Sequence, residues 1–189
     1  NYGWTVASTA SKGMWELGEP QGTAYQSLDA NPDDDVAGDY GADCYVTGNA
    51  GGTAGDDDLD NGSTTLRSPL FNLTTYSNPY ISFYTWFFND GGQGTTPNDS
   101  FTVYLSNGFD TVPVLVINKD SAQSEWRYHQ FRVEDYLFKA INMRLLVTAV
   151  DVNPGHLVEV AFDKFMVVDS PSLNTSVSDF RNELQVKTY

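Results

Sequence analysis

The chain has 189 residues, of which 40% are hydrophobic and 14% aromatic, and it carries a formal net charge of −15. This content supports a sizeable core and excludes global disorder, and the length suits one large domain. The acidic balance argues against nucleic acid and anionic membrane surfaces as partners, because no basic face exists to neutralise phosphates. No apolar run approaches the length of a membrane-spanning helix, so membrane insertion is not expected.

The first third of the chain is rich in loops and in acidic residues. Residues 13–66 contain no lysine or arginine, yet they contain twelve acidic residues, ten of them aspartates. The segment ends in the cluster Asp56-Asp57-Asp58-Leu59-Asp60-Asn61-Gly62. Carboxylate oxygens on tight loops are ligands that Ca²⁺ prefers, so the cluster predicts a structural calcium site, with a solvated acidic loop as the alternative. Its spacing does not match a helix-loop-helix calcium motif.

Short runs of β-branched and aromatic residues follow along the chain, separated by Gly, Asn, Asp and Pro, and this pattern predicts β-strands. In chain order, the expected strands are residues 3–7, 44–47, 64–68, 80–88, 101–106, 112–118, 126–133, 143–151 and 156–168. Only residues 133–140 favour a helix, of one turn. Many short strands without helices between them predict an all-β fold, an antiparallel β-sandwich. We expect this domain in residues 1–169 and a polar tail or linker in residues 170–189.

Residues that could carry catalysis are few. The single cysteine, Cys44, cannot form an intrachain disulfide, and its setting in an apolar strand predicts a buried, inert thiol. The two histidines, His129 and His156, accompany no nucleophile motif and no zinc motif. The carboxylates crowd into N-terminal loops rather than forming an evident acid–base pair. The sequence therefore predicts a noncatalytic chain.

The strand at residues 80–88 has an aromatic face that could bind a ligand. Its odd positions predict the core face, and its even positions include Tyr80, Tyr84 and Trp86. If these three rings are exposed, they form a row that can stack on sugar rings and donate hydrogen bonds. The alternative is that the strand is buried on both faces, because continuous apolar runs favour two-sided burial.

Several blocks of the sequence, taken in order, resemble a known module. These blocks are residues 15–20 (WELGEP), 44–49 (CYVTGN), 58–69 (DLDNGSTTLRSP), 84–89 (YTWFFN), 99–103 (DSFTV), 105–108 (LSNG) and 158–165 (VEVAFDKF). The series is similar to the jelly-roll modules of secreted multidomain proteins of Bacteroidetes, of the MAM and cleaved-adhesin kind, within the galactose-binding-like β-sandwich class. The final residues also resemble the lead-in to a secretion sorting domain.

The resemblance implies a noncatalytic module that is covalently linked to other domains of a larger secreted or cell-surface protein. It also implies structural Ca²⁺ held between the N-terminal segment and the last strand. The positions that match the acidic sites are Glu16, Asp58, Asp60 and Asp163, with Asp57 as an added neighbour. Lys164 stands where a second acidic residue is common, which puts a second ion there in doubt.

Together, these observations predict a calcium-stabilised accessory module of jelly-roll type with a polysaccharide or cell-surface glycan as the expected ligand. An adhesion or spacer domain that binds protein or no ligand is the first alternative. An enzyme with scattered carboxylates is the second. An open aromatic row would favour the glycan-binding module, and a covered row would favour the spacer. Two carboxylates that face each other across a cleft would favour the enzyme.

Overall fold

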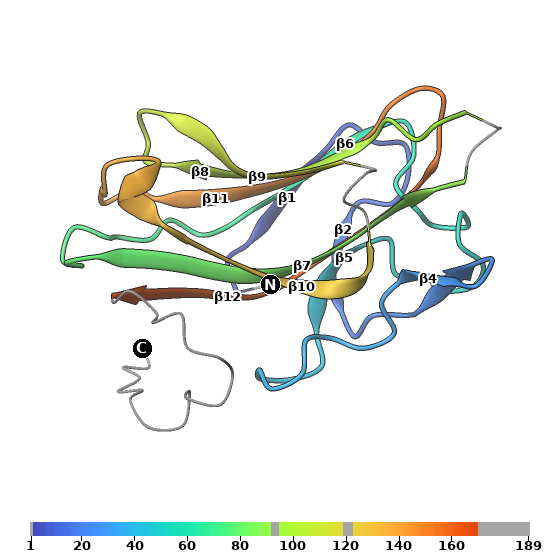
Figure 1. Ribbon diagram of the computed structural model, residues 1–189, viewed down its shortest axis with the longest axis horizontal. Coiled ribbons are helices and arrows are strands. Elements are labelled where there is room, and N and C mark those ends of the chain that lie inside the picture. Colours follow the sequence, from blue (N-terminus) through green and yellow to red (C-terminus); the bar gives the residue numbers. More distant parts are fainter. Residues whose placement is uncertain (1, 92–94, 119–122, 170–189) are drawn as a thin grey trace.

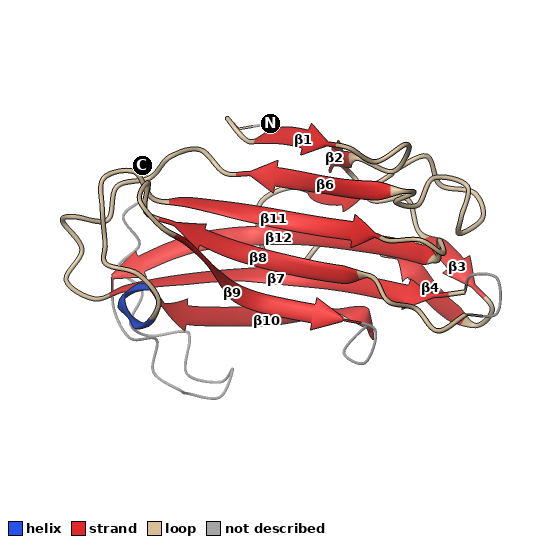
Figure 2. Cartoon of the chain, turned by 90° about the horizontal axis from the view of Figure 1, so that it is seen from above, coloured by secondary structure: helices blue, strands red, loops and turns tan. Residues whose placement is uncertain are grey.

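Two five-stranded antiparallel sheets stack face to face in the computed structural model, which describes residues 2–91, 95–118 and 123–169 (Figure 1). The first sheet has the order β1 (Thr5–Ser8), β6 (Gly62–Arg67), β11 (Arg144–Asp151), β8 (Ser100–Ser106) and β9 (Thr111–Asn118). The second has the order β10 (Gln123–Arg132), β7 (Pro79–Asp90), β12 (Leu157–Asp169), β5 (Cys44–Thr47) and β2 (Trp15–Gly18). Figure 2 looks onto the first sheet.

Strands that follow one another in the sequence repeatedly change sheet. The chain runs from β6 in the first sheet to β7 in the second, returns for β8 and β9, and then alternates through β10, β11 and β12. All pairings in both sheets are antiparallel. The predicted antiparallel β-sandwich of jelly-roll type is therefore confirmed.

The core lies between the sheets and is built by period-2 alternation. Phe101, Val103 and Leu105 of β8 are fully buried, and so are the alternate residues Leu145 and Val147 of β11. From the second sheet, β7 contributes its odd positions, as the sequence predicts: Ile81, Phe83, Thr85 and Phe87 are all buried. Rings from both sheets meet in this layer, since Phe87 stacks on Phe101 at 6.0 Å between centroids.

All nine predicted strands are present, with ends shifted by a few residues. Three short strands were not predicted: β2, and the hairpin of β3 (Thr23–Tyr25) and β4 (Leu28–Asn31). The predicted helical turn is the 3₁₀ turn η2 (Val133–Asp135). Within the described residues, no helix is long and apolar enough to cross a bilayer. The predicted tail, residues 170–189, lies outside the described residues.

The β3–β4 hairpin covers one end of the outer face of the second sheet, where Figure 1 shows β4 beside the lower layer. The indole Nε1 of Trp86 donates to the Ala30 carbonyl of β4 at 2.8 Å. Tyr25 of β3 meets Phe88 edge-on at 6.3 Å between ring centroids. The acidic N-terminal segment is thus packed against the sheet rather than free in solvent.

Candidate functional site

The aspartate loop before β6 is fixed to the last strand and to the N-terminal segment. The Leu59 amide donates to the Val158 carbonyl at 3.1 Å, and the Asp60 amide donates to the Lys12 carbonyl at 3.3 Å. Gly13 passes close to the loop with a φ of 65°, and a Cβ there would lie 2.3 Å from the Asp58 carbonyl oxygen. Glycine is required at this position, because any other residue would clash with the backbone and adopt a disfavoured φ.

Asp58 of this loop and Glu159 of β12 are buried carboxylates that the fold brings together. Each is only 3% exposed. Burial raises the pKa of Glu159 well above its usual range, and the charges of Asp58 and Asp57 raise it further. Burial, with the charge of Asp60 next, raises the pKa of Asp58 to about 7. Among the described residues, the Glu159 Oε2 atom has no hydrogen-bond partner.

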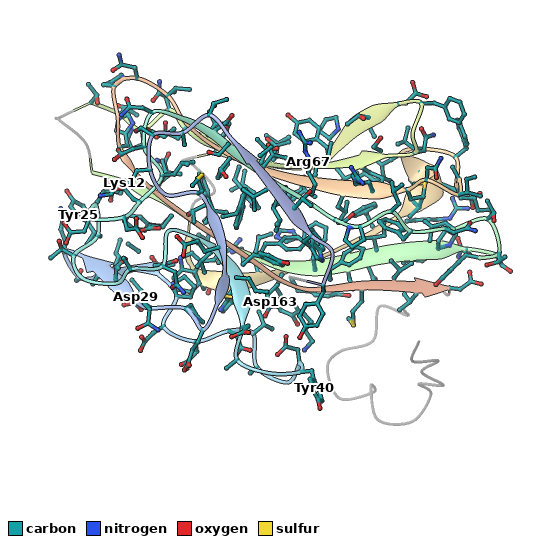
Figure 3. The ribbon with its side chains drawn as sticks, turned by 180° about the vertical axis from the view of Figure 1, so that it is seen from behind. Lys12, Tyr25, Asp29, Tyr40, Arg67 and Asp163 are labelled. Atoms are coloured by element: carbon teal, nitrogen blue, oxygen red, sulfur yellow. The ribbon has the colours of Figure 1, made fainter. Side chains whose placement is uncertain are left out.

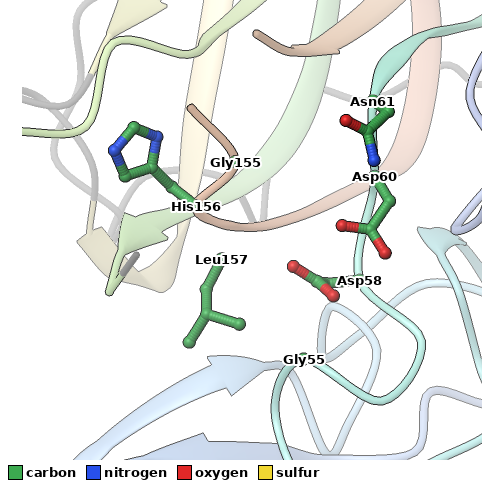
Figure 4. A pocket seen from close by; sticks show the side chains of 7 residues that line it. All are labelled: Gly55, Asp58, Asp60, Asn61, Gly155, His156 and Leu157. Atoms are coloured by element: carbon green, nitrogen blue, oxygen red, sulfur yellow. The ribbon is translucent and has the colours of Figure 1, made fainter. Parts of the chain in front are cut away.

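The neighbouring aspartates differ in what they already bind. One carboxylate oxygen of Asp57 accepts the amides of Asn49 and Ala50, both at 3.0 Å, so Asp57 helps to close the loop on itself. Asp58 and Asp60 line an open hollow of about 380 Å³ together with Gly55, Asn61, Gly155, His156 and Leu157. Figure 4 shows the Asp58 and Asp60 carboxylates side by side, whereas the His156 ring points away from them.

A second polar cluster lies beyond this hollow and consists of the buried residues Asp99, Asp151 and His156. The His156 Nδ1 atom lies 3.0 Å from the Asp99 Oδ2 atom. The other ring nitrogen, Nε2, is 2.9 Å from the Thr95 hydroxyl. Burial raises the pKa of Asp151, and backbone amides that bond to it act in the opposite direction.

The hydrogen bonds of this second cluster identify its role. Both Asp99 oxygens accept, one from the Val152 amide and one from the Asn89 side chain, each at 2.8 Å. Both Asp151 oxygens also accept, from the amides of Asn61 at 2.7 Å and of His156 at 3.3 Å. The cluster therefore ties three separate loops together at one end of the sandwich. Among the described residues, the His156 Nδ1 and Asn89 Oδ1 atoms of this cluster are buried without a hydrogen-bond partner.

Asp163 belongs to a third cluster, on the outer face of the second sheet. Its carboxylate groups with those of Asp35 and Asp39, with ligand atoms within 4.8 Å of one another. One Asp163 oxygen accepts the Val36 amide at 3.2 Å. Burial raises the pKa of Asp163 to about 6, amides of Lys164 and Val36 lower it, and the charges of Asp39 and Asp35 raise it.

The five predicted metal ligands therefore do not lie in one place. Asp57, Asp58 and Asp60 share the loop beside Glu159, whereas Asp163 lies with Asp35 and Asp39. Glu16 is exposed in β2, opposite Val46, and belongs to neither of the clusters with three grouped ligand atoms. A single ion shared by all these residues, as the resemblance implies, does not fit this arrangement. The separation arises because Glu159 and Asp163 are four positions apart on the extended strand β12, with Ala161 between them on the same face.

The aromatic row of β7 is open at only one end. Trp86 is 7% exposed and packs with Cys44, Val46, Ala161 and Trp126, so the alternative of burial on both faces holds at this residue, and Trp86 is not available as a predicted ligand-binding ring. The β3–β4 hairpin and the segment after it cover Trp86, and sequence periodicity cannot show such cover. Cys44 in the same cluster is buried, as predicted, and burial raises the pKa of its thiol above the ordinary range.

Tyr84 and Tyr80 remain partly exposed, and the fold gives Tyr84 a neighbour that the sequence did not indicate. Tyr128 of β10 pairs with Tyr84 across the strands, and their ring centroids are 5.2 Å apart. Tyr128 is 47% exposed. The Lys164 ammonium lies 5.6 Å from the Tyr84 ring centroid on the other side. We call Tyr80, Tyr84 and Tyr128 the tyrosine surface.

Comparison with known proteins shows the fold and no more. No protein-family model and no curated protein matches the chain. The K1 cleaved adhesin domain of Lys-gingipain from Porphyromonas gingivalis W83 is similar in structure, with a TM-score of 0.51 at 14% identity, over 88% of this chain and 90% of that chain. The present chain therefore has the fold of a cleaved adhesin domain.

Two carbohydrate-binding structures are more distant. The CBM22-1 xylan-binding domain of Paenibacillus barcinonensis Xyn10C gives a TM-score of 0.39 at 19% identity, over 87% of this chain and 84% of that one. A carbohydrate-binding module of the β-sandwich superfamily gives 0.49 at 8% identity, over 88% of this chain and 57% of that one. At these scores neither carries an argument about function.

Proposed function

We propose that the chain is a noncatalytic accessory module of a secreted or cell-surface multidomain protein, stabilised by calcium, and that it binds carbohydrate. The tyrosine surface carries the ligand part of this proposal. Three rings on adjacent strands offer apolar faces for sugar C–H groups and hydroxyls for hydrogen bonds. The likeness to an adhesin fold supports a binding role, although it names no ligand.

The donors around Glu159 have the chemistry that calcium prefers, whereas the oxygens of Asp35, Asp39 and Asp163 have the closer spacing. A carboxylate oxygen that is buried and unpaired costs free energy unless a proton or a cation satisfies it. Glu159, Asp58 and Asp60, with Asp57 beside them, offer only oxygen donors, the set that Ca²⁺ prefers. These residues would hold the ion and join the aspartate loop to β12. Asp163 stays a predicted ligand, with Asp35 and Asp39 rather than with the loop.

The noncatalytic part of the proposal has support from the burial of the candidate bases. Two hydroxyl–imidazole pairs resemble a nucleophile and a base: Thr85 with His129, at 2.8 Å, and Thr95 with His156, at 2.9 Å. The His156 side chain is fully buried beside Asp99, in the cluster that ties the loops together. Thr85 lies on the core face of β7 and is buried, so a substrate does not reach it. Asp58 and Glu159 have raised pKa values, but each is only 3% exposed.

The cover over Trp86 favours one alternative, an adhesion or spacer domain that recognises protein or no ligand. A glycan panel of neutral and acidic polysaccharides distinguishes the two. The unmodified chain should bind at least one glycan, and Tyr84→Ala should weaken that binding. Tyr40→Ala is the control, since this tyrosine is fully exposed in the loop between β4 and β5 and is not part of the tyrosine surface (Figure 3). A chain that binds no glycan would support the spacer alternative.

A further inference from the structure

Two arginines differ from the other described lysines and arginines in the partners of their side chains. Of the ten lysines and arginines, Lys119, Arg181 and Lys187 lie outside the described residues, which leaves seven. Five of these have oxygen partners, and they are Lys12, Arg127, Arg132, Lys139 and Lys164. In the described part of the chain, the structure gives the side chains of Arg67 and Arg144 no hydrogen bond and no ion pair. A protein with 25 acidic residues thus leaves two guanidinium groups without a carboxylate.

The two arginines lie on the same outer face of the first sheet, on neighbouring strands. Arg67 of β6 is opposite Leu146 of β11, which in turn is opposite Tyr104 of β8. Arg144 is two residues from Leu146 on the same strand, so it is diagonal to Arg67, at about 7–8 Å between such positions. The alternate residues Leu66 and Leu145 are fully buried, which places both arginines on the solvent side. Figure 2 shows β6, β11 and β8 side by side, and Figure 3 labels Arg67.

This face differs in charge from the rest of the molecule. In the described strands of the first sheet the single acidic residue is Asp151, which is buried and bonded to backbone amides. Thr65 lies two residues before Arg67 on the same face and pairs with Thr148 of β11, and their hydroxyls are 3.0 Å apart. The Arg144 Nε atom is itself buried without a partner. We call Arg67, Arg144, Tyr104, Leu146, Thr65 and Thr148 the arginine face.

We propose that the arginine face binds an acidic polysaccharide, with uronate carboxylates on Arg67 and Arg144 and a sugar ring against Tyr104. The planar guanidinium fork matches a carboxylate and forms charge-assisted hydrogen bonds with it. The threonine hydroxyls suit the hydroxyl groups of a sugar chain. This inference rests on the proposed glycan-binding function, but it uses the sheet opposite the tyrosine surface.

The charge of the whole protein restricts the ligand further. A net charge of −15 repels a dense polyanion, and two arginines release too few counterions to hold a nucleic acid. A mostly neutral chain with scattered carboxylates avoids this repulsion and still reaches both arginines. Glucuronoxylan has this character, and the same polymer after carboxyl reduction is its uncharged counterpart.

The experiment measures binding of the full chain to glucuronoxylan, to carboxyl-reduced glucuronoxylan and to poly-glutamate, at low and at physiological salt. We expect binding to glucuronoxylan to exceed binding to the reduced polymer. Arg67→Ala and Arg144→Ala should each weaken glucuronoxylan binding about tenfold, which corresponds to one charge-assisted contact. Arg127→Ala removes an exposed arginine from the second sheet and serves as the control. Melting curves should place all three variants close to the parent chain.

Several outcomes would overturn the inference. These are equal binding of the two xylans, equal effects of Arg67→Ala and Arg127→Ala, tighter binding of poly-glutamate, which would indicate an acidic protein as partner, or no binding at all. The proposed function is judged separately. If neutral glycans bind and Tyr84→Ala weakens them while the arginine variants change nothing, the arginine face is refuted and the carbohydrate-binding module stands.

Discussion

Asp58 and Glu159 are two buried carboxylates that come from distant parts of the sequence and meet where the aspartate loop bonds to β12. The hydrogen bond from the Leu59 amide to the Val158 carbonyl, at 3.1 Å, fixes their backbones beside each other. Two buried acids that act on each other electrostatically cannot both be ionised without a large cost in free energy, unless a cation lies between them. Protons and calcium therefore compete for the same place, and this competition makes the calcium proposal testable.

Removal of calcium should destabilise the chain. A ligand that binds only the native state stabilises it by about 4 kcal/mol at a thousandfold excess over Kd. We expect chelation to lower the melting temperature by several degrees, and Glu159→Gln or Asp60→Ala to remove most of this sensitivity. Asp163→Asn should retain the part of this sensitivity that comes from the aspartate loop, because Asp163 lies in another cluster. An unchanged melting curve after thorough chelation, with no metal in elemental analysis, would contradict the calcium site.

In the presence of a chelator, stability should fall as the pH rises. The pKa of Asp58 is about 7 in the folded chain, against an ordinary value of 3.8, and the pKa of Glu159 is raised as well. The folded state thus binds these protons more tightly than the unfolded state, so their contribution is complete below about pH 4 and is lost as the pH passes 7. The melting temperature of the parent chain should decrease as the pH rises from about 5 to 8. The decrease should be smaller for Asp58→Asn. A constant or rising curve for the parent chain would refute this assignment.

Gly13→Ala should unfold the aspartate loop or the whole domain. The new Cβ would lie 2.3 Å from the Asp58 carbonyl oxygen, and φ would be 65°. Strained backbone alone costs about 1–3 kcal/mol, and the clash adds to it. Gly51→Ala is the matched control, because its φ of 68° is close to that of Gly13, whereas the atom nearest to the new Cβ, in the Gln21 side chain, is 3.4 Å away. Unfolding in denaturant should show the larger loss of stability for Gly13→Ala. Equal losses for the two variants would show that the aspartate loop can move to accommodate the new Cβ.

Loss of one tyrosine ring should weaken glycan binding without a large change in stability. An aromatic contact is worth about 0.5–1.5 kcal/mol beyond area burial, which is roughly a factor of two to ten in affinity. We expect this for Tyr84→Ala, Tyr128→Ala and, near the strand end, Tyr80→Ala. Affinity measurements beside melting curves provide the check. If Tyr80→Ala strongly destabilises the chain, that ring belongs to the packing of the sheet.

Trp86→Ala should instead act on stability. The indole is buried against Trp126 and Ala30, so its truncation leaves a cavity that costs about 3–5 kcal/mol. Trp86→Phe fills part of this volume and should cost less. Thermal melts of the two variants show which substitution lowers the stability more. Stability equal to that of the parent chain after Trp86→Ala would show that the β3–β4 hairpin does not pack on the sheet in solution.

The sequence alone determined the sandwich, because its longer strands carry their own period-2 signal. Residues 101–106 and 143–151 alternate between apolar and polar positions, and one buried face of a sheet requires this. The acidic loop was also visible, since a run of aspartates without a nearby cation is a local feature. The short strands β2, β3 and β4 lacked such signals. The β3–β4 turn has Gln26 at a φ of 58°, where glycine or asparagine would have marked a hairpin.

Tertiary structure alone decided which residues share a site. Glu159 stands in an apolar strand, and only the loop packed against it reveals a buried acid beside Asp58. Asp163 and Asp58 appear alike in the sequence, yet they lie in different clusters. Asp58 is beside Glu159, and Glu159 and Asp163 are four positions apart on the extended strand β12, a distance that one ion cannot bridge. The cover over Trp86, the Tyr84–Tyr128 pair and the unpaired arginines all depend on contacts between strands distant in sequence. These features share one physical reason. The periodicity of the sequence shows toward which face of a sheet a side chain points. Its neighbours depend on which strands pair and on which segments pack on the sheet.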